Sequence, residues 1–158
     1  MRLIFEAYDS EGIMQSLLII DDNVIFRRTV AAILSSRFPA LKIIQAKTPS
    51  GALVMCRRRD LGLVLMDIDL NEGNGLTLLK EIRRRRPHTR IAVVTDKDTM
   101  EYQKAAFGNG ADYFFSKSGH DGRSIIRTVC DCLAIADRCP VSETVPLPIR
   151  ASLKSYRG

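Results

Sequence analysis

Residues Leu63 to Met66 form a short, continuous apolar run that ends at a carboxylate, Asp67. Such a run, bounded by turn residues, is typical of a strand buried on both faces of a parallel sheet. The residues that follow, up to Gly75, are rich in Gly and Asn, which indicates a loop. An acid at the carboxyl end of a buried parallel strand lies where open α/β sheets place their chemistry, although a capping role in the next turn is equally compatible with it.

Four more apolar runs predict buried strands of the same kind, and a stretch with helical spacing follows each of the five. The predicted strands cover residues 16–20, 41–46, 63–66, 90–95 and 111–116. The predicted helices cover residues 24–38, 48–59, 75–86, 98–109 and 121–137. Thr48 and Pro49 provide a cap and a first-turn proline for the second helix. The faces predicted to turn inward are Phe26, Val30, Ile33 and Leu34 in the first helix, Leu76, Leu79 and Ile82 in the third, and Ile125, Ile126, Val129, Cys130 and Leu133 in the fifth.

This alternation predicts an α/β fold, a doubly wound, five-stranded parallel sheet with helices on both faces. The 158 residues, 46% of them hydrophobic, are enough for one domain with a sizeable core. We expect that domain over residues 16–138, an extension over 1–15 and a flexible tail over 139–158. Met14 offers an alternative start, so residues 1–13 can also lie outside the native chain.

Right-handed crossovers place the carboxyl ends of all five strands at one edge of the sheet. The polar residues that would meet there are Asp21, Asp22, Asp67, Thr95 and Lys117. Three carboxylates in one place repel one another and need a cation to coexist, and a hard ion with oxygen ligands such as Mg²⁺ suits them. The hydroxyl and the ammonium are donors suited to a phosphoryl group. An aspartate carboxylate can itself act as the nucleophile and form an aspartyl-phosphate.

The combination resembles the receiver domain of two-component response regulators (CheY-like), in a single-domain form. The resemblance covers about Ser16 to Asp137. Its motifs are Ile19-Ile-Asp-Asp22, Leu65-Met-Asp67 with Gly75 eight residues later, Val93-Val-Thr95 and Gly110-Ala-Asp-Tyr-Phe-Phe-Ser-Lys117. It implies the flavodoxin-like strand order 2-1-3-4-5.

The resemblance also implies the chemistry of the site. Asp67 would receive a phosphoryl group from a phosphohistidine of a sensor histidine kinase or a histidine phosphotransfer protein. Asp21 and Asp22 would hold Mg²⁺ together with Asp67 and the backbone carbonyl of Asp69. The protein would then be no enzyme in the usual sense, since it carries out only self-phosphorylation and autodephosphorylation.

Two further residues would respond to the phosphoryl group. Thr95 would hydrogen-bond its oxygens and Lys117 would pair with them. Phe114 matches the aromatic switch position of the family, although a plain core aromatic is the alternative because Tyr113 and Phe115 flank it. The signal would change the surface formed by the fourth helix, the fifth strand and the fifth helix. We expect the output to pass through a partner, a homodimer or a phosphorelay, because only about twenty residues follow the fifth helix.

The sequence departs from the family at three positions around the site. Asn71 and Ser118 stand where prolines are usual, and Asp96 follows Thr95 where a small residue is usual. These departures bear on the reaction rates and on the lifetime of the phosphorylated form. We expect Asp96 to oppose small anionic donors, and Lys97 to offset this by pairing with Asp96 or Asp69.

Charge and cysteine content leave other readings open. The net charge of +6 lies largely in Arg57 to Arg59 and Arg83 to Arg86, which are expected to complement the dipoles at two helix ends. The four cysteines form no metal-binding pattern and are expected to be free thiols of a cytoplasmic protein. No apolar run is long enough to cross a membrane. The alternatives are a receiver-like interaction module without phosphoryl turnover and a small basic nucleic-acid binder, for which no groove-reading motif is present.

Overall fold

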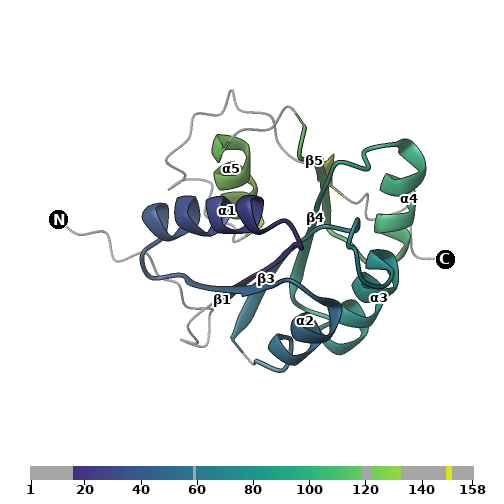
Figure 1. Ribbon diagram of the computed structural model, residues 1–158, viewed down its shortest axis with the longest axis horizontal. Coiled ribbons are helices and arrows are strands. Elements are labelled where there is room, and N and C mark those ends of the chain that lie inside the picture. Colours follow the sequence, from purple (N-terminus) through teal and green to yellow (C-terminus); the bar gives the residue numbers. More distant parts are fainter. Residues whose placement is uncertain (1–15, 59, 119–121, 133–148, 151–158) are drawn as a thin grey trace.

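The computed structural model describes residues 16–58, 60–118, 122–132 and 149–150 (Figure 1). Strands and helices alternate along it. The strands are β1 (Ser16–Ile20), β2 (Lys42–Ala46), β3 (Leu61–Met66), β4 (Arg90–Thr95), β5 (Tyr113–Ser116) and β6 (Ile149–Arg150). The helices are α1 (Val24–Arg37), α2 (Pro49–Met55), α3 (Gly75–Arg85), α4 (Met100–Gly108) and α5 (Gly122–Cys132).

The strands form one sheet in the order β2-β1-β3-β4-β5-β6, in which the first five are parallel and β6 is antiparallel to β5. The predicted α/β fold and its strand order 2-1-3-4-5 are therefore confirmed. Helices α1 and α5 cover one face, and α2, α3 and α4 cover the other (Figure 1). Two apolar cores result, one on each side of the sheet.

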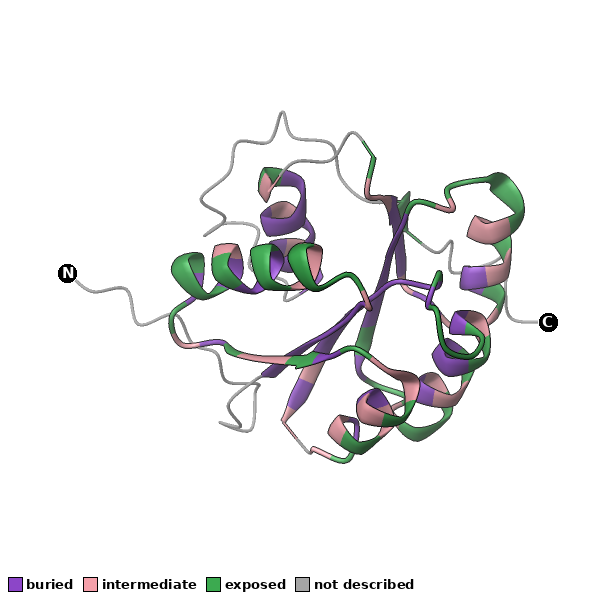
Figure 2. Cartoon of the chain, in the orientation of Figure 1, coloured by how far each residue is buried: buried purple, intermediate pink, exposed green. Residues whose placement is uncertain are grey.

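Strand β3 divides its side chains between these cores. Leu63 and Leu65 pack with α1 and α5, whereas Val64 and Met66 pack with α2, α3 and α4. This alternation follows from the two-residue period of a strand, and it explains why the whole run is apolar. Figure 2 shows the central strands as buried, with exposed residues on the outer sides of the helices.

Side-chain caps start three of the helices. The Oδ1 atoms of Asn23 and Asn74 each accept two backbone N–H groups at the starts of α1 and α3. Thr48 Oγ1 accepts the N–H of Gly51 at 3.2 Å, and Pro49 is the first residue of α2, as predicted. Caps of this kind satisfy N–H groups that have no partner within the helix.

Helix α2 ends earlier than predicted, at Met55 instead of near Arg59. The N–H groups of Arg57 and Arg58 bond to carbonyls three residues back, which tightens the chain before β3 begins. The basic run therefore follows the end of α2 instead of lying in its last turn. Arg58 instead forms an ion pair with Asp60 at 3.1 Å.

The prediction of a tail without regular structure is wrong at Ile149–Arg150, which form β6. A two-residue strand has no periodicity to recognise, and it forms here only because β5 offers an unpaired edge. Residues 1–15, Leu133 and Cys139 lie outside the described residues, so the predictions about them are untested. Cys56, Cys130 and Cys132 are buried and take part in no disulfide within the described part. No helix among the described residues is both long and apolar enough to cross a membrane.

Candidate phosphoryl-transfer site

Backbone hydrogen bonds continue beyond the strand ends and align the residues that follow them. The N–H of Asp67 donates to the carbonyl of Ile20 at 2.9 Å, and the N–H of Lys117 donates to the carbonyl of Thr95 at 2.9 Å. The N–H of Asp21 bonds to Ala46 at 3.2 Å. The sheet thereby brings Asp21, Asp67, Thr95 and Lys117 to one edge.

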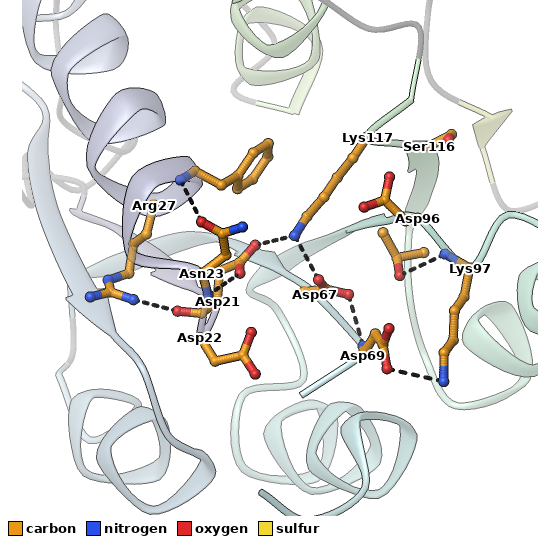
Figure 3. A network of polar contacts seen from close by, with 12 residues as sticks. Asp21, Asp22, Asn23, Arg27, Asp67, Asp69, Asp96, Lys97, Ser116 and Lys117 are labelled. Atoms are coloured by element: carbon orange, nitrogen blue, oxygen red, sulfur yellow. Dashed lines mark hydrogen bonds and ion pairs between the residues drawn. The ribbon is translucent and has the colours of Figure 1, made fainter. Parts of the chain in front are cut away.

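The Lys117 ammonium lies between two carboxylates at this edge (Figure 3). Its Nζ is 2.6 Å from Asp21 Oδ2 and 2.7 Å from Asp67 Oδ2. The three side chains are almost fully buried, with exposed fractions of 11%, 2% and 6% for Lys117, Asp21 and Asp67. Two buried carboxylates that share one ammonium avoid the repulsion that they would otherwise suffer.

The surroundings shift the pKa values of this group in a consistent way. Burial raises the pKa of the Asp21 carboxyl, and the hydrogen bond from Lys117 reverses only part of that change. Burial alone would lower the pKa of Lys117, but its hydrogen bonds with Asp21 and Asp67 outweigh burial and raise it. Lys117 is therefore a permanent cation at neutral pH.

The other two predicted metal ligands have different partners. Asp22 Oδ2 accepts the N–H of Asn71 at 2.7 Å, which joins the β1–α1 loop to the β3–α3 loop. Asp69 Oδ1 is 3.0 Å from Lys97 Nζ (Figure 3), so of the two predicted partners of Lys97 it is Asp69 that is found. The Asp69 N–H donates to Asp67 Oδ1 at 2.8 Å and fixes the orientation of that carboxylate.

The donor set fits a hard cation, but the described geometry does not gather it around one point. Asp21 and Asp67 already bind a single cation, Lys117, through one oxygen each. Within the described ranges, no group of three or more His, Cys, Asp or Glu side chains is close enough to hold a metal ion.

Thr95 and Phe114 lie deeper in the sheet. Thr95 is fully buried, and its Oγ1 accepts the N–H of Lys97 at 3.2 Å, which leaves its hydroxyl hydrogen available. Phe114 is 2% exposed and contacts the ring of Phe107 edge-on, at 6.3 Å between centroids. In this state Phe114 is a core aromatic on the side of α3 and α4.

The first turn of α1 contributes contacts that sequence reasoning missed. The ring of Phe26 lies 4.3 Å from Lys117 Nζ, in a cation–π contact. Arg27 Nη1 donates to the Asp21 carbonyl at 2.6 Å, and the Asn23 N–H donates to Asp21 Oδ1 at 2.8 Å (Figure 3). Helical spacing identified Phe26 as inward-facing, but nothing in the sequence pairs it with a residue 91 positions away.

Gly75 shapes the loop that carries Asp67. A Cβ atom at this position would lie 2.2 Å from the backbone oxygen of Ile68, so only glycine allows the loop and the start of α3 to approach so closely. The spacing of eight residues between Asp67 and Gly75 therefore has a steric cause.

A groove of about 430 Å³ opens beside Lys117, between α1 and the loop after β5. Its polar lining includes Asn23, Thr29, Asp96, Lys117 and Ser118. Asp96 accepts a hydrogen bond from the Ser118 hydroxyl at 3.0 Å, so it joins the loops that follow β4 and β5. An exposed carboxylate, that of Asp96, thus lines the groove that reaches Lys117.

A parallel sheet in this order, with acids after β1 and β3 and a lysine after β5, is the arrangement that the resemblance to receiver domains implied. The chain matches the response regulator receiver domain family over residues 17–128 and belongs to that family. It is a receiver domain of two-component signal transduction.

Two bacterial proteins are similar to the chain over most of the same residues. The chain is 31% identical to the photosynthetic apparatus regulatory protein RegA of Rhodobacter capsulatus, over 71% of this chain and 60% of that protein. It is 30% identical to the fimbriae Z protein of Salmonella typhimurium, over 65% of this chain and 49% of that protein. The chain thus spans about half to three fifths of the length of these relatives.

Solved structures show the same fold. A CheY-like receiver domain protein from Methanospirillum hungatei is 24% identical, with a TM-score of 0.70, over 78% of this chain and 96% of that one. A response regulator from Burkholderia pseudomallei, solved with a phosphorylated aspartic acid, a calcium ion and citrate, is 26% identical, with a TM-score of 0.66 over 78% of this chain and 72% of that one.

Proposed function

We propose that Asp67 is the phosphoryl acceptor of this receiver domain. The observation that carries the proposal is the Lys117 ammonium, 2.7 Å from Asp67 Oδ2 at a buried sheet edge. The Asp69 N–H holds the other carboxylate oxygen, so Asp67 Oδ2 is the oxygen that turns toward the cation. The related regulator with a phosphorylated aspartic acid supports the same chemistry.

The reaction transfers a phosphoryl group from a histidine nitrogen to a carboxylate oxygen. An oxygen of Asp67 forms a bond to phosphorus as the phosphorus–nitrogen bond of a phosphohistidine breaks, and the imidazole leaves with the electron pair of that bond. The donor is a sensor histidine kinase or a histidine phosphotransfer protein. Lys117 pairs with the new phosphoryl oxygens, and the Thr95 hydroxyl donates to one of them.

Asp21, Asp22 and Asp67, with the backbone carbonyl of Asp69, are the groups that would hold Mg²⁺. The ion would supply positive charge to the phosphoryl oxygens. Asp21 is held ready by Arg27 and Asn23. Asp22 is held by Asn71, and its second carboxylate oxygen is available as a ligand.

The signal leaves the site through β5, because Lys117 follows directly after that strand. When Thr95 and Lys117 move toward a phosphoryl group, we expect Phe114 to shift in its core. The surface formed by α4, β5 and α5 would then change, and an output partner or a second copy would bind to it. A cytoplasmic location stays a prediction.

Mass spectrometry of the intact protein after incubation with acetyl phosphate and Mg²⁺ tests the acceptor. We expect one added phosphoryl group in the parent and none in Asp67→Asn, which keeps the shape of the side chain. The control Asp98→Asn, at an exposed carboxylate, should label like the parent. Labelling of Asp67→Asn at the parental level would refute the assignment. A parent that takes up nothing at any Mg²⁺ concentration would favour the interaction module without turnover.

A further inference from the structure

Strand β6 covers the free edge of β5. Arg150 is paired with Tyr113, and Ile149 is paired with Phe114, in antiparallel register. Without β6, the backbone N–H and C=O groups along this side of β5 would be open to any extended chain. The edge of β5 therefore has the geometry that an extended peptide needs, and Ile149–Arg150 of the same chain occupy it (Figure 1).

The side chain of Arg150 adds two contacts to this pairing. Its Nε donates to Asp131 Oδ2 on α5 at 2.9 Å, and its Nη2 pairs with Asp131 Oδ1. Its guanidinium also lies over the ring of Tyr113, 5.7 Å from the centroid. The planar guanidinium can bind a carboxylate through two nitrogens and stack on an aromatic ring at the same time, whereas a lysine ammonium would form both contacts less favourably.

Burial is unequal on the two sides of this contact. The Asp131 side chain is only 12% exposed, whereas Arg150 is 58% exposed. Ile149 is also exposed, at 53%. The receiving groups thus belong to the packed domain, while the occupant lies on its surface and buries little. An occupant of this kind is replaceable by another segment with the same features.

We propose that the β5 edge, with Tyr113 and Asp131, is a binding site for an extended peptide segment in which an aliphatic residue precedes arginine, and that Ile149–Arg150 fills it as an intramolecular competitor. The backbone edge selects an extended conformation, and Asp131 and Tyr113 select the arginine. A partner that carries such a segment binds by displacing β6. The proposal does not depend on whether Asp67 accepts phosphate.

Tethering sets how strongly β6 competes. A segment tethered to the domain that it binds can have an effective concentration on the order of 1 mM. A free peptide with an intrinsic Kd of about 0.1 mM would then bind the parent roughly tenfold more weakly than it binds a variant in which β6 does not pair with β5.

Titration with a synthetic peptide of residues 145–153, followed by NMR at the Tyr113 and Phe114 amides, tests the site. The variant Arg150→Glu places a second carboxylate beside Asp131 and should release β6 from β5. Because Arg150 is exposed, the substitution leaves the two apolar cores intact. We expect the peptide to bind this variant at least fivefold more tightly than the parent. A peptide that itself carries Arg150→Glu should bind the variant far more weakly.

The charge-reversed chain Asp131→Arg with Arg150→Glu provides the matched control. In this double variant β6 should pair with β5 again, and the unmodified peptide should bind no better than it binds the parent. Equal affinities for the parent and Arg150→Glu would overturn the proposal. So would unchanged Tyr113 and Phe114 amides in Arg150→Glu at millimolar peptide. Neither readout involves phosphorylation, so the outcome is independent of the acceptor test.

Discussion

At the scale of single residues, one ammonium decides the state of the site. Lys117 replaces the water that two buried carboxylates have lost, and the Phe26 ring covers it. A Mg²⁺ ion held as proposed would take Asp21 as a ligand and weaken its ion pair with Lys117, which would leave the ammonium freer to pair with phosphoryl oxygens.

Asp21 should lower the stability of the metal-free protein at neutral pH. Because burial raises its folded pKa above the unfolded value, the folded state binds the proton more tightly. The free energy of unfolding then falls as pH rises from the unfolded pKa through the folded one. We expect Asp21→Asn to raise the thermal midpoint at pH 7 without Mg²⁺ by a few degrees, where about 1 kcal/mol corresponds to roughly 2–4 °C.

This advantage should shrink as pH approaches 4, because the parental carboxyl is then protonated as well. Thermal melts of both proteins from pH 4 to 7.5 provide the measurement. A midpoint of Asp21→Asn below the parental value at pH 7 would mean that the ion pair with Lys117 outweighs the cost of burial. In Mg²⁺ the order should reverse, since only the parent keeps this ligand.

Asp96 should slow labelling by small anionic donors. Asp96 lines the groove beside Lys117, and we expect its charge to repel a phosphoryl group that approaches this edge. With screening by solvent, we expect Asp96→Ala to speed acetyl phosphate labelling by up to about tenfold and to shorten the phosphorylated lifetime.

Ser118→Ala separates the charge of Asp96 from its contact. It removes the 3.0 Å hydrogen bond between the two loops and keeps the carboxylate. Labelling of Ser118→Ala should stay close to the parental rate. If Ser118→Ala labels as fast as Asp96→Ala, the contact between the loops controls the labelling rate. If Asp96→Ala labels within twofold of the parental rate, Asp96 does not affect labelling.

At the scale of elements, one arginine at the end of α3 joins several segments. Arg83 Nε donates to the Gly110 carbonyl at 2.9 Å, Nη1 donates to those of Pro87 and Thr89, and Nη2 pairs with Asp112 at 2.7 Å. A Cβ atom at Gly110 would lie 2.6 Å from Arg83 Cγ, and the φ of +105° there also requires glycine. The interpretation of this basic run as a dipole complement alone is therefore too narrow.

Loss of Arg83 should destabilise the domain. Arg83→Ala removes a donor from four carbonyls and from one partly buried carboxylate, and we expect a loss of about 2–4 kcal/mol in urea unfolding. Arg84→Ala is the matched control, because Arg84 is 71% exposed and pairs only with Glu81 on the same helix. That variant should unfold like the parent. Equal effects of the two substitutions would show that the Arg83 contacts do not contribute.

At the scale of the whole molecule, the sheet places the site and both cores at once. The two faces are closed by different sets of helices, and the strand ends meet where neither set covers them. The parallel part of the sheet ends at β5, and among the described residues only Ile149 and Arg150 pair with its far edge. The phosphoryl site and the proposed peptide site therefore share one four-residue strand.

The sequence by itself determined the layer architecture and the residues at the sheet edge. Apolar runs and helical spacing are local signals, and the rule of right-handed crossovers converts them into positions of Asp21, Asp67, Thr95 and Lys117. Local signals also identified the Thr48 cap. The location of helix ends depended on less local effects, so α2 is shorter than its pattern suggested.

Only the tertiary structure decided which charges meet. Lys117 bridges Asp21 and Asp67, Asp22 binds Asn71, and Asp69 binds Lys97. The sequence predicted only the last of these pairs, and only as one of two alternatives for Lys97. The strand β6 and its Arg150–Asp131 contact were also invisible, since two residues carry no period. The physical reason is that ion pairs and edge pairings depend on distances between segments remote in the chain, whereas composition and periodicity report only on neighbours.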